Sequence, residues 1–326
     1  MRKLLFFLLT AIYCLINLLW DLYWRITRSE RISSRVISVG NITVGGSGKT
    51  SLAEYIASRL LSGGVKTAVV ARGYKRPASS SLAICDSQSH DWESCGDEAA
   101  ALARSIEGLK IYVDSSKTYA ALKASEDGHE VVVVDDGFQH RRLGRDLDIV
   151  CIDSFNPFGN GWLLPYGILR EPIRSLKRAD VFVVFVENND IDISNLSLPS
   201  GKQVFKARKK IKSIESDKNE LIDLKGKKVI GFCGIANPDS FYNTLENTGA
   251  DIVAFERFKD HYIYRIEDIE SLTGLMEKAD ANTAVTTLKD FVKIERDWPH
   301  DKKLCYIKIN LDIDNEEEFI RLIRDE

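Results

Sequence analysis

A glycine-rich segment near the start of the chain has the composition of a phosphate-binding loop. Its residues are Thr43, Val44, Gly45, Gly46, Ser47, Gly48, Lys49, Thr50 and Ser51. Glycines let successive backbone N–H groups approach phosphate oxygens, and the positive end of a helix that starts near Thr50 adds to the attraction. Lys49 would reach the β- and γ-phosphates, and the Thr50 hydroxyl would bind Mg²⁺. The segment therefore predicts a binding site for a nucleoside triphosphate.

The residues of this loop also narrow the class of nucleotide-binding protein. Thr43 replaces the first glycine of the usual motif, and Gly45 and Gly46 keep the backbone adaptable nearby. Partition ATPases carry an extra lysine near the start of the loop, where this chain has Val44. A guanine-binding N-K-x-D sequence is also missing, since Thr287-Leu-Lys-Asp290 only resembles it. We therefore expect ATP rather than GTP.

Two acidic residues that follow an apolar run could hold the metal ion. The run 131–134 consists of four valines and leads directly into Asp135 and Asp136. A buried parallel strand that ends in a carboxylate places it at the edge of the sheet where ligands bind, beside the metal of a bound triphosphate. The alternative is that both acids only cap the following turn. We predict a Mg²⁺ site formed by Thr50, Asp135 and Asp136.

The segments that would position these residues alternate between strands and helices. Strands are expected at 36–39, 67–71, 111–113, 131–134, 149–152 and 181–186, and helices at 50–61, 96–106 and 117–124. Because these strands are apolar along their length, we expect a parallel sheet covered by helices on both faces. This is an α/β fold of the P-loop NTPase type.

The composition changes between residues 188 and 225, where the chain becomes polar and basic. This stretch predicts a linker, or an extended connection of two strands. After it, strands at 229–233, 251–255, 283–286 and 304–309, with helices at 238–248, 266–278 and 316–324, predict a second, smaller α/β domain. We thus expect a membrane-associated helix at 1–30, a P-loop kinase domain at 31–190, a linker at 191–225 and a smaller domain at 226–326 that closes over the cleft.

Length, charge and cysteine content exclude some classes of protein. The 326 residues suffice for two domains, and the formal net charge of -3 gives no general attraction for nucleic acid. None of the six cysteines forms a C-x-x-C pair, and their spacing suggests no zinc site. We therefore expect reduced, mostly buried thiols in a cytosolic setting and no nucleic-acid partner.

The N-terminal segment 4–20 is almost entirely apolar. Arg2 and Lys3 precede it, and Trp20, Trp24 and several arginines between residues 25 and 35 follow it. No small-residue cleavage site of a signal peptide follows the run, whereas an aromatic and basic flank is typical of a membrane interface. Since ATP is cytoplasmic, we expect a helix on the cytoplasmic face of the membrane. A single span and a buried core helix are the alternatives.

Nine short motifs together resemble the tetraacyldisaccharide 4'-kinases, the lipid A 4'-kinase family. They are SVGNITVGGSGKT at 38–50, ARGYK at 71–75, GDE at 96–98, DDGFQHR at 135–141, RDLD at 145–148, LLP at 163–165, LREP at 169–172, FKDH at 258–261 and TTLKD at 286–290. Two positions depart from the family pattern. Ser51 stands where many members have proline, and Leu288 stands where a glutamate is common.

The resemblance implies an activity, a substrate and a location. The family transfers the γ-phosphate of ATP to the 4'-hydroxyl of tetraacyldisaccharide 1-phosphate, a precursor in lipid A (lipopolysaccharide) biosynthesis. It does so at the cytoplasmic face of the inner membrane, with two α/β/α domains joined by a strand linker. For this chain the resemblance therefore implies ATP and Mg²⁺ as cofactors, the inner-membrane lipid surface as a partner, and a monomer.

The resemblance also implies the catalytic residues. Lys49 would neutralise the charge of the transferred phosphate, Asp97 would be the general base, and His261 would assist it. From the sequence alone, Asp97 could equally be an acid at a helix N-terminus, and His261 a surface histidine. About 160 residues separate the two, so we expect them in different domains that form the site only on closure.

Five further residues are candidates for contacts with the substrate. Gln139 and His140 follow the two metal-binding acids, where contacts with the phosphate or with water and simple packing are alternatives. Arg72, Arg170 and Lys289 could neutralise phosphate charge, including that of the 1-phosphate group of the acceptor.

Two other functions remain as alternatives to a lipid kinase. A P-loop kinase or ligase for a soluble metabolite would have no need of the apolar N-terminal segment. A nucleotide-switch protein, such as a metallochaperone or transport ATPase, would transfer phosphate only to water.

Overall fold

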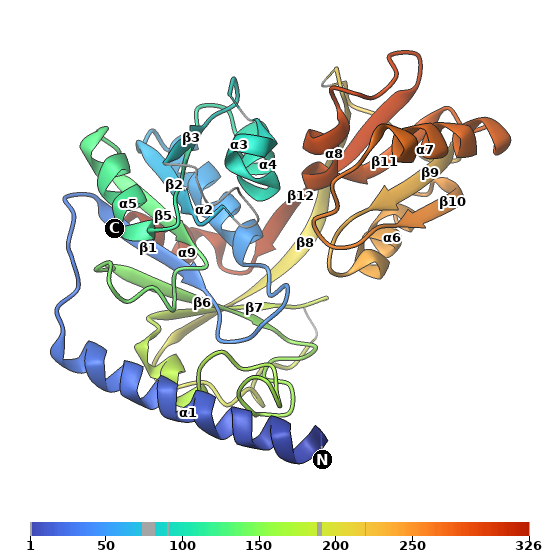
Figure 1. Ribbon diagram of the computed structural model, residues 1–326. Helices are drawn as coiled ribbons and strands as arrows, with labels where there is room; N and C mark the ends of the chain where they lie inside the picture. The colour runs from blue at the N-terminus through green and yellow to red at the C-terminus, as the bar shows by residue number, and fades with distance from the viewer. Residues whose placement is uncertain (1, 74–81, 90, 188–190, 219, 326) are drawn as a thin grey trace. The chain divides into compact units, whose positions relative to one another are not determined.

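The computed structural model describes residues 2–73, 82–89, 91–187, 191–218 and 220–325. The chain forms two compact units. Unit 1 contains Met1–Arg72, Leu109–Lys209 and Leu311–Glu326, and unit 2 contains Gly73–Gly108 and Lys210–Asn310. Both units are built from strands and helices that alternate along the chain, which confirms the predicted α/β class (Figure 1).

Unit 1 is organised around a parallel sheet. Its strands are β1 (Arg35–Gly40), β2 (Thr67–Ala71), β4 (Lys110–Val113), β5 (Val131–Asp135), β6 (Leu147–Asp153), β7 (Val181–Phe185) and the first half of β8 (Gln203–Ser216). They pair in parallel in the order β8-β7-β6-β1-β5-β2-β4. The central strands β1, β2 and β5 are buried almost throughout, as expected for apolar strands covered on both faces.

Three α-helices and a short 3₁₀-helix pack with this sheet. They are α2 (Lys49–Ser62), α5 (Lys117–Glu126), α9 (Glu316–Arg324) and η1 (Ile173–Arg178). The C-terminal helix α9 belongs to unit 1, where Glu316 accepts hydrogen bonds from Tyr55 and Arg59 of α2. The sequence-based boundaries grouped this helix with the smaller domain.

The N-terminal helix α1 (Arg2–Ile26) lies along unit 1, beside the loops that follow β6 (Figure 1). The Tyr13 hydroxyl donates to the carbonyl of Arg170, and the Thr10 hydroxyl oxygen accepts from the backbone N–H of Tyr166. Most of its remaining described side chains are apolar and exposed. The alternative of a buried core helix is therefore wrong.

The strands of unit 2 pair in parallel in the order β10-β9-β11-β12. Its strands are β9 (Lys228–Cys233), β10 (Asp251–Arg257), β11 (Thr283–Thr287) and β12 (Lys303–Ile313), and its other elements are β3 (Ala83–Cys85), α3 (Trp92–Cys95), α4 (Asp97–Ser105), α6 (Pro238–Glu246), α7 (Ile266–Lys278) and α8 (Leu288–Ile294). Phe232, Phe291 and Tyr306 are among the fully buried side chains of its core.

The compact units group the chain differently from the expected domains. Residues 73–108 join unit 2, although they lie between two strands of unit 1 in the sequence. The segment 191–225 contributes one long strand, β8, and the chain returns on β12, which neighbours β8 in the sheet order. The division into a kinase domain, a linker and a closing domain stays a prediction.

The cysteines differ from the expectation of reduced thiols. Cys85 and Cys95 are joined by a disulfide that links β3 to α3. The expectation was wrong for this pair because the structure brings together two cysteines that are ten positions apart in the sequence. The other four are free, and Cys151, Cys233 and Cys305 among them are buried.

Candidate active site

The glycine-rich loop connects β1 to α2 in unit 1, as predicted. Asn41, which precedes the loop, connects two of its hydroxyl groups: the side-chain amide donates to Thr43 Oγ1 at 3.2 Å and to Ser47 Oγ at 2.7 Å. The backbone N–H of Val44 donates to the carbonyl of Ile168 at 2.8 Å. Gly46 has open space around it, and Ser51 lies in the first turn of α2. The loop is thus held at both sides while its centre stays accessible.

Gly48 occupies a position that only glycine fits. Its φ angle is 81°, in the left-handed region, and a Cβ there would approach the ring of Phe185 to 2.4 Å. Gly48 is also the N-cap of α2, so its backbone turns the loop directly into the helix. This close turn leaves the first N–H groups of α2 available to a phosphate, as helix N-termini are in such loops.

Thr50 and Asp135 meet at the point where the metal ion was predicted. The Thr50 hydroxyl donates to Asp135 Oδ2 at 3.0 Å, and Asp135 is the last residue of β5. Among the described residues there is no cluster of three or more His, Cys, Asp or Glu side chains that could hold a metal alone. One hydroxyl and one or two carboxylates fit Mg²⁺, which takes its remaining ligands from substrate phosphates and water.

Asp136 lies among cations. Arg170 Nη1 donates to both carboxylate oxygens of Asp136, at 2.8 and 3.0 Å, and Lys49 Nζ is 3.9 Å from Oδ1. Burial alone would raise the pKa of Asp136, but the charges of Lys117, Arg170 and Lys49 outweigh it and lower the pKa. The carboxylate is therefore ionised at neutral pH, in the state that a Mg²⁺ ligand requires.

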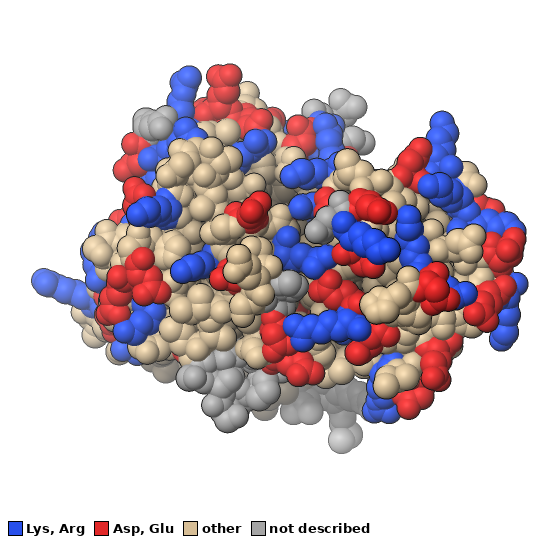
Figure 2. Space-filling view, turned by 90° about the horizontal axis from the view of Figure 1, so that it is seen from above, with Lys and Arg blue, Asp and Glu red and all other residues tan. Residues whose placement is uncertain are grey.

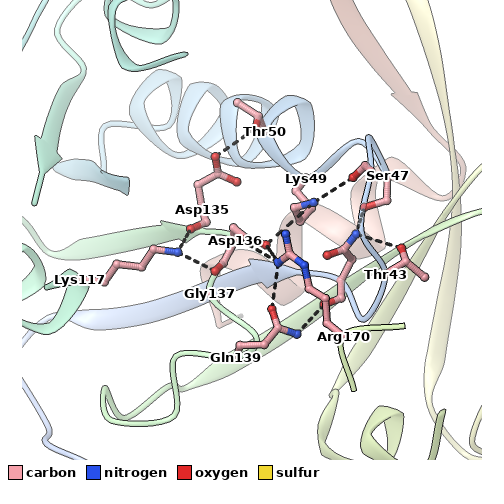
Figure 3. Close-up of polar contacts among 12 residues, drawn as sticks. Thr43, Ser47, Lys49, Thr50, Lys117, Asp135, Asp136, Gly137, Gln139 and Arg170 are labelled. Atoms are coloured by element: carbon pink, nitrogen blue, oxygen red, sulfur yellow. Dashed lines mark hydrogen bonds and ion pairs between the residues drawn. The ribbon is translucent and has the colours of Figure 1, made fainter. Parts of the chain in front are cut away.

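Lys117 holds the backbone of the two acids, and no sequence motif marks it. Its ammonium donates to the carbonyls of Asp135 at 2.7 Å and Asp136 at 2.6 Å (Figure 3). Asp136 has a φ angle of 50°, a strained conformation for a residue other than glycine. The two hydrogen bonds from a buried ammonium hold this turn in place. Lys117 lies in a segment predicted only as a helix, with no motif around it.

Gln139 and His140 follow the acids and make contacts of different kinds. Gln139 accepts from Arg170 at 3.2 Å and donates to the carbonyl of Asn41 at 2.8 Å, so it connects the phosphate loop with Arg170. His140 Nε2 is 2.8 Å from the Thr118 hydroxyl. Burial, followed by the nearby cations, lowers the pKa of His140 to about 4, so its ring is neutral at pH 7. Both contacts position the turn, and a role in binding phosphate stays a prediction.

Asp97 and His261 meet in unit 2. His261 Nδ1 and Asp97 Oδ2 are 2.8 Å apart, and the two side chains are only 14% and 10% exposed. Burial would raise the pKa of Asp97, but the hydrogen bond with His261 and the charges of His261, Lys293 and Lys289 lower it. The same hydrogen bond raises the pKa of His261. The pair is a hydrogen-bonded dyad that can accept and share a proton.

The expectation that Asp97 and His261 come from different domains is wrong. Residues 73–108 belong to unit 2, and α4 packs on α8 there through the ion pair of Arg104 with Glu295, at 2.9 Å. The dyad is therefore complete within one compact unit, and its formation requires no domain closure.

The remaining candidates for substrate contacts are more dispersed. Arg72 is exposed at the end of β2 in unit 1, and Lys289 pairs with Glu98 in unit 2. Arg170 is the only one of the three that lies against a predicted metal-binding acid in the described structure. Tyr74 and Lys75 of the ARGYK motif lie outside the described residues.

Comparison with known proteins identifies the family of this chain. A family model described as tetraacyldisaccharide-1-P 4'-kinase (LpxK) matches residues 2–326. The tetraacyldisaccharide 4'-kinase of Halothermothrix orenii is 36% identical over 93% of this chain and 85% of the relative. That of Elusimicrobium minutum is 34% identical over 92% of this chain and 84% of the relative.

A solved structure is similar over the whole length. The crystal structure of LpxK from Aquifex aeolicus in complex with ATP has a TM-score of 0.81 and 27% identity, covering 100% of this chain and 99% of that one. The motifs that carried the resemblance, the fold and these matches all agree. The chain is a kinase and belongs to the tetraacyldisaccharide-1-P 4'-kinase family.

Proposed function

We propose that this kinase transfers the γ-phosphate of ATP to the 4'-hydroxyl of tetraacyldisaccharide 1-phosphate in lipid A biosynthesis. The observation that carries the proposal is the presence of two complete sets of residues. A phosphate loop with adjacent acids lies in unit 1, and a buried Asp–His dyad lies in unit 2. A phosphate loop alone would suit any nucleotide-binding protein, whereas the dyad adds a base for an alcohol acceptor.

The donor half of the reaction rests on unit 1. Residues 43–51 bind the triphosphate, and Lys49 and Arg170 neutralise charge on the transferred group. Thr50, Asp135 and Asp136 would hold a Mg²⁺ ion, which when bound shields the phosphate oxygens from the attacking oxygen. Lys117 and Gln139 keep Asp136 and Arg170 in place through the contacts described above.

The acceptor half rests on unit 2. A sugar hydroxyl has a high pKa and attacks well only if a base takes its proton as the new bond to phosphorus forms. Asp97 is the base, because its carboxylate is ionised at neutral pH and is oriented by His261. The γ-phosphorus–oxygen bond to ADP breaks as the new phosphate ester forms, and the proton passes to the dyad. Lys289 and Arg72 are candidates for binding the acceptor's 1-phosphate.

The decisive test mixes the purified protein with γ-labelled ATP, Mg²⁺ and tetraacyldisaccharide 1-phosphate. We expect label in a bisphosphorylated lipid, with one ADP released for each phosphate transferred. Label that appears only as inorganic phosphate would identify a nucleotide-switch ATPase instead. Activity towards soluble sugars with none towards the lipid would favour the metabolite kinase.

We further propose that α1 lies in the membrane interface on the cytoplasmic face of the inner membrane. Phe6–Ile26 is long and apolar enough to cross a membrane, with a mean hydropathy of 1.7. However, Thr10, Tyr13 and Asp21 bond to unit 1 along one side of the helix. In a span, these polar contacts and Arg141, the partner of Asp21, would lie in hydrocarbon, where such groups are costly. An in-plane helix keeps the contacts and buries its outer face in lipid.

The charge of the neighbouring residues supports the same orientation. Arg25 and Arg31, at the end of α1 and shortly after it, form ion pairs with Asp21 and Asp146 at 3.1 Å, and their side chains are still 69% and 73% exposed. Such arginines are attracted to anionic lipid headgroups. By contrast, basic and acidic side chains are interspersed on the face shown in Figure 2. We expect a monomer bound to a lipid surface, with no nucleic-acid partner.

Replacing two exposed leucines of α1 should release the protein from lipid. Leu15 and Leu19 are 55% and 57% exposed, so Leu15→Asp/Leu19→Asp removes no packed core side chain. Each leucine that enters the bilayer contributes about 1.5–3 kcal/mol, so we expect binding to anionic vesicles to fall more than tenfold in a flotation assay.

The matched control is Leu221→Asp, which changes a leucine that is 77% exposed in unit 2. It should float with vesicles as the wild type does. Extraction with alkaline carbonate separates the two orientations, because it releases an interfacial helix and leaves a spanning helix in the membrane. A double variant that still floats would contradict the proposed role of α1.

A further inference from the structure

A buried ion pair in α8 lies next to the dyad, and the proposed reaction gives it no role of its own. Lys293 Nζ is 2.8 Å from Asp290 Oδ1, and the two side chains are 2% and 0% exposed. Both residues belong to α8, and Asp290 ends the TTLKD motif. A buried charge is costly unless its remaining hydrogen-bonding groups are also satisfied. The further partners of this pair lead to both members of the dyad.

Lys293 contacts the dyad directly. Its ammonium lies 3.8 Å from Asp97 Oδ2, the same oxygen that faces His261 Nδ1. It also donates to the carbonyl of Tyr262, the residue after His261, at 2.9 Å. One positive charge therefore holds the carboxylate of Asp97 and the backbone next to His261.

Asp290 is connected to His261 by two hydrogen bonds that share the backbone of Gly234. Asp290 Oδ2 accepts from the backbone N–H of Gly234 at 2.9 Å, and the Gly234 carbonyl accepts from the N–H of His261 at 3.0 Å. His261 has a φ angle of 56°, a strained conformation that the surrounding contacts must maintain. The Thr287 hydroxyl, at 2.8 Å, also donates to Asp290 Oδ2. The carboxylate thus connects the start of α8 to the turn that carries the histidine.

We propose that Lys293, held by Asp290, is a positioning residue for the acceptor half of the reaction, which fixes the Asp97 carboxylate against His261. The inference rests on the proposed role of the dyad and adds a buried group that acts through Asp97 and His261. It also assigns a role to Asp290 of the TTLKD motif, which has no other role in the proposed mechanism.

The charges around the dyad determine how removal of Lys293 would change the pKa values of Asp97 and His261. Asp97 is faced by His261 from the turn after β10, and by Lys293 and Lys289 from α8, while Asp260 lies 3.9 Å from His261 Nε2. Removing a cation makes protonation of both Asp97 and His261 easier. The pKa of each group should therefore rise when Lys293 becomes neutral.

The test replaces Lys293 with methionine, which keeps the length of the side chain and removes its charge. We expect Lys293→Met to lower kcat at pH 7 roughly tenfold or more, with an unchanged KM for ATP. The pH–rate profile and the imidazole titration of His261, followed by NMR and assigned with His261→Asn, should move to higher pH by about 1–3 units. The titration needs no substrate, so it tests the inference even if the lipid assay fails.

Two further variants separate positioning from stability. Arg104→Met removes another ion pair between α4 and the end of α8, with Glu295, and should lower the melting temperature without shifting the titration. Lys293→Met/Asp290→Asn removes both buried charges, and the asparagine oxygen can still accept from Gly234. We expect this double variant to fold even if the single variant, with Asp290 buried and unpaired, does not.

The outcomes are distinct. A folded Lys293 variant with wild-type kcat and an unchanged His261 titration would overturn the proposal. So would equal effects of Lys293→Met and Arg104→Met, or a double variant that does not fold, because the pair would then serve stability alone. If the wild type makes no bisphosphorylated lipid while the titration shifts as expected, the proposed function fails and the positioning of Asp97 and His261 stands.

Discussion

Asp97→Asn is expected to lower kcat by roughly 10²- to 10⁴-fold, with little change in KM for ATP. The carboxylate is 10% exposed on its side chain and hydrogen-bonds to His261. Asparagine has nearly the same shape and can still accept a hydrogen bond, but it cannot take the proton of the sugar hydroxyl. Single-turnover measurements with tetraacyldisaccharide 1-phosphate would separate this chemical defect from a binding defect.

The matched control for Asp97 is another acid at a helix N-terminus in unit 2. Asp239 lies in the first turn of α6 and forms an exposed ion pair with Arg257. Asp239→Asn should retain wild-type kcat, because it loses only a favourable charge at a helix end. If Asp97→Asn behaves as Asp239→Asn does, Asp97 is an ordinary helix-terminal acid and the base must be another group.

Lys49→Met is expected to reduce kcat/KM for ATP on the order of 10³-fold, close to complete loss of turnover. The ammonium lies between the loop and the acids, 3.4 Å from the carbonyl of Gly45 and 3.9 Å from Asp136. From this position it can stabilise negative charge on the phosphate that moves. Methionine keeps the length of the side chain, so the loss reports on the charge.

A lysine elsewhere in unit 1 provides the control for this variant. Lys123 on α5 pairs with Glu126 near the surface. Lys123→Met should leave both kcat and KM at the wild-type values. Binding of a fluorescent ATP analogue to Lys49→Met would show whether the loop still holds the nucleotide. Substantial turnover by Lys49→Met would remove this residue from the donor half of the site.

Most elements of the fold could be predicted because their signals are local. The strands at β1, β2 and β5 and the helix after the glycine-rich loop followed from short apolar runs and from the loop itself. The short helix α8 was not predicted, because seven residues are too few to show a clear helical period of apolar side chains. The long strand β8 lies in the stretch predicted as a linker or an extended connection of two strands, because many of its residues are exposed and its pattern is not apolar.

The residues of the candidate site also differ in whether a local sequence signal marks them. The loop of residues 43–51 and the acids Asp135 and Asp136 are contiguous motifs, so the sequence alone was enough to predict them as site residues. Lys117 and Asn41 act through hydrogen bonds to backbone and hydroxyl groups, and no motif marks such contacts. Lys293 could not be predicted from the sequence either. Its proposed role depends on a buried ion pair with Asp290, three positions away, and on the carboxylate of Asp97 in another helix.

The sequence by itself determined the class of this protein, the nucleotide loop and the family, since each depends on residues that are close together in the chain. Only the tertiary structure decided which unit holds Asp97. Its segment follows β2 in the chain, and α4 of this segment packs on α8. That choice depends on contacts between residues about 190 positions apart, such as Arg104 with Glu295. The structure likewise decided that α1 presents a polar face to unit 1 and an apolar face to its surroundings. Burial and charge pairing at a distance govern both features, and neither is encoded in any short stretch of residues.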